Sequence, residues 1–151
     1  MLIRRERALT AVEIMLDVAF HAGRAGTVSA ADLAERLRQA RRGLEPLLQI
    51  LARTGMLDSI RGPRGGYRLG RPARDITLAE IAATMTEAQA PPGEANAGPA
   101  ASLGAIADAA WLAADQAAVE ALRAVTLEDL VRRAVAAGLR RPTMEPVSYA
   151  I

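Results

Sequence analysis

The chain has 151 residues, 51% of them hydrophobic and 24% charged, which is typical of a folded domain and excludes an intrinsically disordered chain. It contains no cysteine and one histidine. This excludes disulfides, cysteine zinc sites and thiolate-ligated iron–sulfur clusters, and it disfavours histidine metal sites and Ser-His-Asp triads. The net charge of +2 is unevenly spread, because residues 1–74 carry +7 and residues 75–151 carry −5, and every basic residue is an arginine. The basic half predicts an anionic partner.

The N-terminal region does not have the pattern of a targeting segment. Its basic start is followed by an apolar run that Glu13 and Asp17 interrupt, so it predicts an amphipathic helix rather than a signal peptide. The alanine-rich stretch 100–124 contains acidic residues and does not predict a membrane span. We therefore expect a cytoplasmic protein with no membrane partner.

Three amphipathic helices are expected first, over about 6–22, 29–38 and 42–54, because apolar residues recur there at helical spacing. Ser29, with an acidic residue three positions later, is a capping-box start for the second helix. Pro46 complicates the third helix, because proline is well tolerated only in the first turn. Either this helix begins near Arg42 or Gly43, or its first turn is distorted.

A change of period then predicts a β-hairpin, in which two short apolar runs, 56–60 and 67–69, flank a glycine-rich turn at 61–66. Thr77 and Glu80 repeat the capping-box pattern and start a short helix. Three helices followed by a hairpin are the layout of a winged helix-turn-helix domain.

The rest of the chain predicts a linker, a helical arm and a tail. Residues 87–102 are rich in proline, glycine and alanine and have no period, so they are expected to form a loop or linker. A long alanine-rich helix and a shorter one occupy 103–137, and 138–151 is expected to be an irregular tail. Residues 1–86 form the expected DNA-binding domain. The expected fold class is mainly α with a small β-hairpin, a winged helix-turn-helix domain plus a long dimerisation helix.

The second helix of a helix-turn-helix enters the major groove, where side chains of its first turns reach base edges. Arginine can bond guanine, glutamate can accept from cytosine, and glutamine can pair with adenine. The candidates in the helix around 42–54 are Arg41, Arg42, Glu45 and Gln49. Arg36 and Arg38, just before this helix, are candidates for phosphate contacts. The alternative is a solvated charged face on an ordinary helical bundle.

Arg61 and Arg64 flank the tip of the hairpin, or wing. An arginine on such a wing can enter an A·T-rich minor groove, where the electrostatic potential is most negative. A phosphate-binding loop fits less well, because 61–66 joins two strands and no Lys-Ser/Thr pair follows it. The remaining alternative is a tight hairpin with incidental arginines.

Small residues recur at alternating four- and three-residue spacing along the long helix and predict close packing against a second copy. The expected dimer interface comprises Leu103, Ala107, Ala110, Trp111, Ala114, Ala117 and Ala121. A two-fold dimer would present two reading heads to a palindromic site on double-stranded DNA. The alternative is a helix folded back on its own domain.

The wing sequence Arg-Gly-Pro-Arg-Gly-Gly-Tyr-Arg-Leu at 61–69 is distinctive, and the segments 76–81 and 126–130 accompany it. Together these stretches resemble the Rrf2 (IscR-like) family of bacterial winged-helix transcription regulators. The resemblance implies a homodimeric regulator in which Glu45 tunes the choice of site and Arg61 enters the minor groove.

The same resemblance identifies a departure. Relatives that bind an iron–sulfur cluster place three cysteines after residue 86 and at the start of the long helix, whereas this chain has Ala105 and Asp108 at the later ligand positions. The resemblance therefore implies a member without the cluster, and no cofactor or metal is expected. The family's known DNA sites are not expected to carry over, because the reading helix departs at Ala40, Arg42, Gly43 and Pro46.

The sequence thus predicts a sequence-specific DNA-binding transcription regulator, a homodimeric repressor without enzymatic activity. Two alternatives remain open. One is a winged-helix module that binds an acidic protein. The other, compatible with DNA binding, is a regulator that senses a small-molecule effector through the 87–102 loop.

Overall fold

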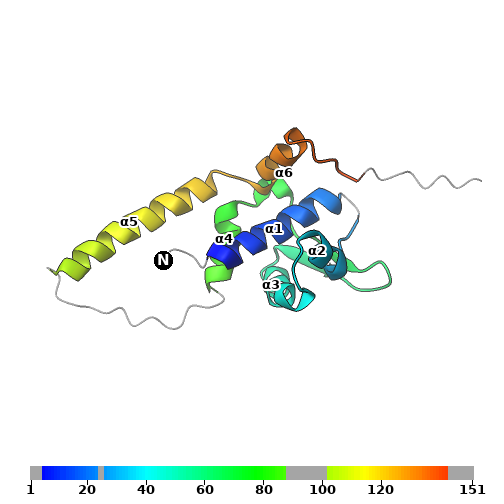
Figure 1. Ribbon diagram of the computed structural model, residues 1–151, viewed down its shortest axis with the longest axis horizontal. Helices are drawn as coiled ribbons and strands as arrows, with labels where there is room; N and C mark the ends of the chain where they lie inside the picture. The colour runs from blue at the N-terminus through cyan, green and yellow to red at the C-terminus, as the bar shows by residue number, and fades with distance from the viewer. Residues whose placement is uncertain (1–4, 24–25, 88–101, 143–151) are drawn as a thin grey trace, which may run out of the picture.

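The computed structural model describes residues 5–23, 26–87 and 102–142. Helices dominate it, and one antiparallel hairpin follows the third helix (Figure 1). The elements in chain order are α1 (Arg5–His21), α2 (Ala30–Arg36), α3 (Arg41–Arg53), β1 (Leu57–Ile60), β2 (Gly66–Leu69), η1 (Ala73–Asp75), α4 (Leu78–Glu87), α5 (Leu103–Arg123) and α6 (Leu127–Ala136). The predicted fold class is confirmed. Most of the expected linker and most of the expected tail lie outside the described residues.

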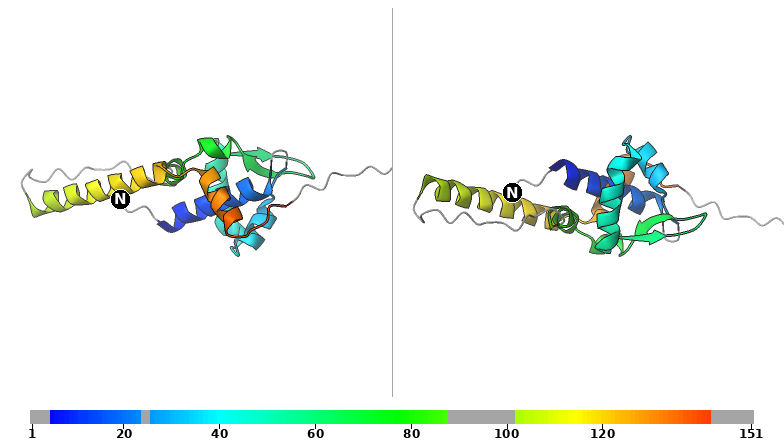
Figure 2. Two further views of the ribbon diagram at one scale, coloured as in Figure 1. Left: turned by 90° about the horizontal axis from the view of Figure 1, so that it is seen from above. Right: turned by 90° about the horizontal axis from the view of Figure 1, so that it is seen from below.

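The hydrophobic core lies where α1 packs against α4, the hairpin and α3, and α2 closes one side of it (Figure 2). Helices α1, α2, α3, α4 and α6 contribute apolar residues to it at the spacing that places them on one face. The largest fully buried side chains are Ile14, Met15, Val18, Leu33, Leu44, Leu48, Leu51, Leu57, Ile76, Ile81 and Leu127. Burial of one such side chain contributes about 1.5–3 kcal/mol, so this cluster holds α2 and α3 against the hairpin.

Helix α6 belongs to this body, although the sequence groups it with the arm in 103–137. Its first residue, Leu127, is fully buried in the core. Two backbone bonds fix its start, from Leu127 N to the carbonyl of Ile76 at 2.8 Å and from Leu78 N to the carbonyl of Val125 at 3.0 Å. The sequence shows the apolar face of α6, but not that α1 covers it.

The starts of α2, α4 and α6 follow from side-chain capping. Ser29 Oγ accepts the backbone N–H three residues on, at 3.1 Å. Thr77 and Glu80 form a reciprocal capping box, with bonds of 3.2 and 2.9 Å, and Thr126 and Asp129 form a second one. Each box satisfies two of the N–H groups that a helix start leaves unpaired.

Helix α3 begins at Arg41, one residue before the earlier of the two expected starts, and includes Pro46. Its N-cap, Ala40, makes no side-chain cap bond. Gly43 N instead donates to the Ala40 carbonyl at 2.8 Å, a tightened three-residue turn. Because Pro46 has no N–H, the Arg42 carbonyl loses its helical donor, and Arg42 lies on the exposed face.

Strands β1 and β2 pair with Leu57 opposite Leu69 and Ile60 opposite Gly66. A third extended segment joins them, because Val28 bridges Tyr67 through bonds of 2.9 and 2.8 Å. Gly66 makes this approach possible. Its φ is +155°, and a Cβ there would lie 2.5 Å from the Val28 carbonyl oxygen.

Helix α5 extends away from this body as an arm (Figures 1 and 2). It starts at the capping residue Ser102, ends at Arg123, and buries none of its residues. Its C-terminal end contacts α4. Among the described residues, no helix is long and apolar enough to cross a membrane.

Candidate nucleic-acid interface

The exposed face of α3 carries the four side chains that the sequence assigns to base reading. The buried face holds Leu44, Leu47, Leu48 and Leu51. At 100° per residue, the exposed residues Arg41, Arg42, Glu45 and Gln49 fall within about a quarter of the helix circumference, beside the buried face. The structure therefore brings these four together on one solvent-facing stripe.

Arg41 and Glu45 form an ion pair across one helical turn, with Nε 3.7 Å from Oε1. Both side chains are more than half exposed, so this pair contributes little to the stability of the fold. The pair does affect the charge of the stripe. Because the carboxylate of Glu45 offsets the charge of Arg41, the positive charge of the stripe comes from Arg42.

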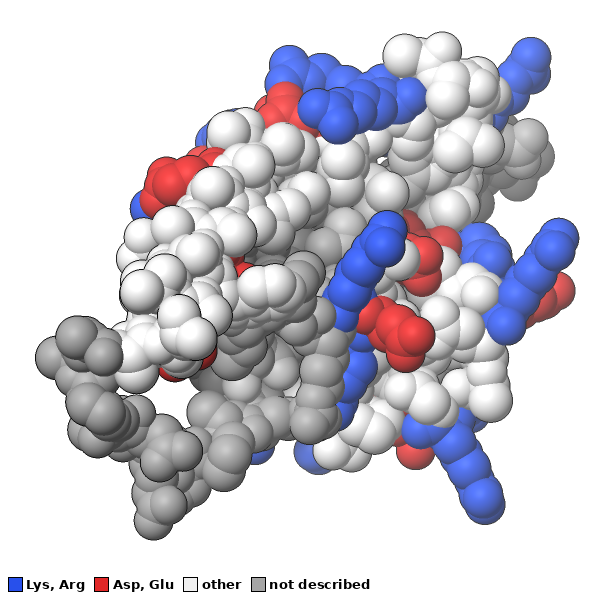
Figure 3. Space-filling model, turned by 60° about the vertical axis from the view of Figure 1, so that its left-hand side comes forward, with Lys and Arg blue, Asp and Glu red and all other residues white. Residues whose placement is uncertain are grey.

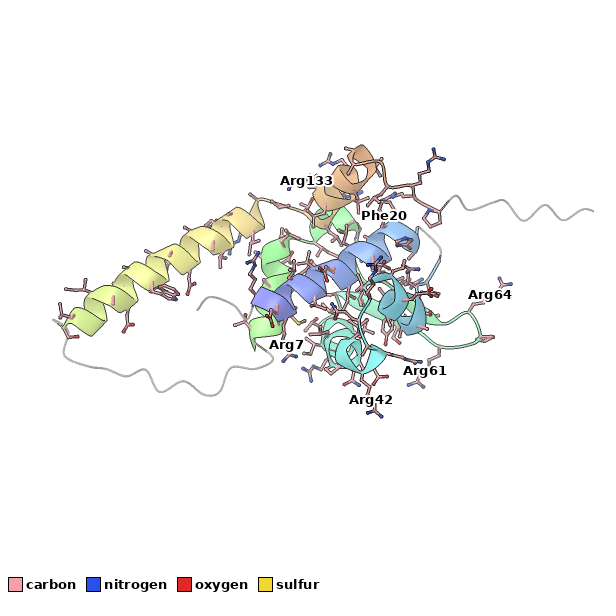
Figure 4. All side chains as sticks on the ribbon, in the orientation of Figure 1. Arg7, Phe20, Arg42, Arg61, Arg64 and Arg133 are labelled. Carbon is pink, nitrogen blue, oxygen red and sulfur yellow. The ribbon has the colours of Figure 1, made fainter. Side chains whose placement is uncertain are left out.

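The wing adds two arginines next to this stripe. Arg61 and Arg64 are both exposed, and strand β1, which leads into the wing, packs against α3. Arg42 and Arg61 project toward the lower edge of the view, Arg64 extends from the far end of the wing, and Arg133 of α6 lies at the opposite, upper edge (Figure 4). Cations on α3 and along the wing are a suitable arrangement for a phosphate backbone and its grooves.

The turn between α2 and α3 holds Arg38 in an unusual conformation. Its φ is +52°, the left-handed region, and it is the one non-glycine residue with positive φ in the described chain. The surrounding bonds, Arg38 N to the Glu35 carbonyl at 3.2 Å and Gln39 N to the Ala34 carbonyl at 3.0 Å, form a Schellman cap. The guanidinium is thus presented at the turn at some backbone cost.

Arg36, a predicted phosphate contact, is bonded within the protein. Its guanidinium donates two parallel hydrogen bonds to Asp17 of α1, which is buried. This bonding holds the pKa of Arg36 above its ordinary value, and burial opposes the shift only in part. Arg36 therefore has a structural role in joining α2 to α1, and we leave it out of the proposed interface.

Sequence reasoning missed Thr27, which contacts the wing from outside. Thr27 Oγ1 donates to the backbone carbonyl of Arg64 at 2.9 Å, across a separation of 37 residues. No local pattern identifies such a partner, because the bond depends on the Val28–Tyr67 bridge beside it.

Gly65 of the wing is packed closely against the backbone of the turn. A Cβ on Gly65 would lie 2.5 Å from the Ile60 carbonyl oxygen and 2.8 Å from that of Gly62. Gly65 N donates to the Gly62 carbonyl at 2.8 Å and closes the turn. Gly65 therefore has a packing role within the turn.

The described residues do not fit an iron–sulfur cluster or a metal ion. The chain has no cysteine, and within the described ranges no three His, Asp or Glu side chains gather as ligands. Ala105 and Asp108, at the later ligand positions of cluster-binding proteins, are on α5 without a thiolate between them. The loop 88–101 lies outside the described residues.

Helix α5 leaves its predicted interface open. Leu103 is 88% exposed and Trp111 53%, and the seam alanines are exposed as well. Seen from the side of the arm, its surface is mainly uncharged (Figure 3). Exposed Ile106 lies beside this stripe of small residues, and exposed Leu112 and Val119 form a second apolar stripe. A helix folded back on its own domain does not describe this structure.

Comparison with known proteins gives consistent matches. Residues 5–133 match the model of the family Rrf2, described as an iron-dependent transcriptional regulator. The HTH-type transcriptional regulator IscR of Photobacterium profundum is 44% identical over 77 residues, which are 51% of this chain and 44% of that protein. IscR of Escherichia coli is 42% identical over 77 residues, 51% of this chain and 47% of that protein. The chain spans somewhat under half the length of these curated relatives.

Solved structures extend the likeness to nearly the whole chain. IscR of T. potens has a TM-score of 0.71 at 28% identity and covers 89% of each chain. CymR (YrzC), the global cysteine regulator of B. subtilis, has a TM-score of 0.70 at 27% identity, over 88% of this chain and 98% of that one. These proteins are transcriptional regulators and not enzymes, so the prediction that this chain is not an enzyme is confirmed.

Proposed function

The chain belongs to the Rrf2 family of transcriptional regulators, and from this premise we propose that it is a homodimeric repressor that binds a palindromic operator in the cytoplasm. Helix α3 reads the major groove with Arg42, Glu45 and Gln49. The wing places Arg61 and Arg64 in the flanking minor grooves. The observation that carries the proposal is that Arg42 of α3 and Arg61 of the wing project from the same side of the body (Figure 4).

The charge distribution supports this assignment. The basic half of the chain contains α3 and the wing, and α5 and α6 belong to the acidic half. Arginine contacts to phosphates release counterions, so binding should weaken steeply with salt. Arg38, at the turn before α3, and Arg41, at the start of α3, complete the proposed interface by contacting phosphates of the DNA backbone.

Self-association through α5 would bring together two DNA-binding domains, one from each copy of the chain. An exposed helix with large apolar side chains on two stripes is unfavourable in water. Close packing of two alanine seams would cover Leu103 and Trp111 and place the two α3 helices on one face. A two-fold protein pairs with a two-fold operator.

The proposal is tested by selection of bound duplexes from a random DNA pool, followed by titration of the selected duplex at several salt concentrations. Two inverted half-sites should emerge, and log Kd should change linearly with log salt. Arg61→Ala should weaken binding and reduce the slope of log Kd against log salt concentration by about 1. Arg133→Ala, which removes the same charge from the opposite edge, should leave both unchanged. A protein that ignores duplex DNA at low salt would contradict the proposal.

The signal that this regulator receives is a separate part of the proposal. Without thiolates, we infer a regulator that needs no iron–sulfur cluster and responds to a small-molecule effector or a protein partner. A thermal-shift screen of small metabolites tests the first option, because a ligand that binds the native state raises the melting temperature.

A further inference from the structure

The tip of the wing is fastened to the body by a bond that lies outside the sheet. Thr27 Oγ1 donates to the carbonyl of Arg64 at 2.9 Å. Next to it, Val28 and Tyr67 exchange two backbone hydrogen bonds, of 2.9 and 2.8 Å. The segment before α2 therefore pairs with β2 as a short third strand. Thr27, next to this pairing, links the segment to the tip of the wing.

The tip has few other restraints. Within 61–65, the bond from Gly65 N to the Gly62 carbonyl closes the turn, and the Thr27 hydroxyl is the side chain that holds it from outside. Gly62, with a φ of +118° and no heavy atom within 4 Å of a Cβ position, leaves the turn free to change shape. The Thr27 bond is therefore placed to decide where the wing arginines lie.

We propose that Thr27 is a positioning residue for DNA binding, which holds the wing tip in the conformation that delivers Arg61 and Arg64 to the minor groove. Its hydroxyl is engaged with Arg64, so it acts through the wing rather than by its own contact with DNA. A pre-ordered wing loses less conformational entropy when it binds. The bond also keeps the Arg64 carbonyl paired within the protein, away from the phosphates that this oxygen would repel.

This inference rests on the proposed function, and the test separates the two. The probe is the selected duplex, and a second duplex has the A·T pairs beneath the wing replaced by G·C. Thr27→Val removes the hydroxyl with little change of shape, and Thr27→Ser keeps it. Thr10→Val is the matched control, because the Thr10 hydroxyl bonds to the carbonyl of Glu6 within α1.

Thr27→Val should weaken binding about three- to tenfold, the usual effect of one lost hydrogen bond, and should reduce the preference for A·T beneath the wing. Thr27→Ser and Thr10→Val should bind like the wild type. In an Arg61→Ala/Arg64→Ala background, Thr27→Val should cause no further loss. Hydrogen exchange at Gly65 N should be faster in Thr27→Val and restored in Thr27→Ser.

Each contrary result has a defined meaning. Wild-type binding that Arg61→Ala weakens but Thr27→Val does not would overturn this inference alone. An equal loss from Thr27→Val in the doubly substituted background would also overturn it, because the effect would not pass through the wing. Absence of wild-type binding would overturn both this inference and the proposed function.

Discussion

Asp17 and Arg36 join the first helix to the second through two parallel hydrogen bonds, Nε to Oδ2 at 2.8 Å and Nη2 to Oδ1 at 2.7 Å. Asp17 is 8% exposed, and His21 Nδ1 lies 3.4 Å from its Oδ2. The pair therefore sets the position of α2, and with it the turn into α3.

Loss of this pair should destabilise the fold. Arg36→Met removes the guanidinium and leaves a buried carboxylate without its two donors, which should cost about 2 kcal/mol in the free energy of unfolding. Urea unfolding followed by circular dichroism measures it. Arg41→Met, which breaks the exposed pair with Glu45, should change stability by less than about 0.5 kcal/mol. If the two variants are equally stable, the Asp17 pair has no special structural role.

Arg38 should show opposite effects on stability and on binding. Arg38→Gly relieves a left-handed backbone and should stabilise the protein by about 1 kcal/mol, while it weakens DNA binding because a cation leaves the turn. Gly55, which has a φ of +75° in an equivalent Schellman cap after α3, provides the reverse control. Gly55→Ala should destabilise through the backbone alone, since nothing lies within 4 Å of its Cβ position. Thermal melts and DNA titrations of each variant give the comparison.

The bonds of Arg36 and Arg64 show which features of the structure the sequence does not predict. Helix spacing, capping boxes and the glycine-rich turn are local patterns, so they predict the element order, the helix starts and the exposed stripe of α3. The Asp17–Arg36 pair and the Thr27–Arg64 bond join distant residues and depend on tertiary packing. For the same reason, the sequence placed Arg36 among the phosphate contacts and α6 with the arm.

The seam of α5 should control self-association. Ala114→Glu places a charge in the middle of the small-residue stripe, and burial of an unpaired charge should weaken the dimer about a hundredfold. Gln116→Glu adds the same charge away from the seam and should have little effect. Sedimentation velocity over a concentration series measures both. Equal dissociation constants for the two variants would argue against the alanine seam as the interface.

Glu45 should affect sequence preference more than affinity. Glu45→Ala removes an acceptor that suits cytosine, so one base position in each half-site should lose about 1–3 kcal/mol of discrimination. The salt slope should not decrease, because no cation is lost and Arg41 is released from its ion pair. Selection from a random pool with each variant tests this, with Gln49→Ala expected to relax a different position. A uniform loss across all sequences would contradict a base-reading role for Glu45.

The capping box of α6 should make stability depend on pH in the acid range. The Thr126 backbone N–H, then the Thr126 hydroxyl and Arg132, donate to Asp129 and lower its pKa from 3.8 to about 2. The unfolded chain therefore binds a proton more readily than the native one, so the stabilisation is complete above the ordinary value and is lost as the pH falls toward 2. The hydrogen bond from the Thr77 backbone N–H likewise lowers the pKa of Glu80.

Asp129→Asn keeps an acceptor for Thr126 but cannot ionise, so its melting temperature should fall less between pH 5 and pH 2 than that of the wild type. Glu128→Gln, which removes a charge from the same turn without a change in the box, should keep the wild-type slope. An equal fall in Asp129→Asn and the wild type would place the acid sensitivity elsewhere.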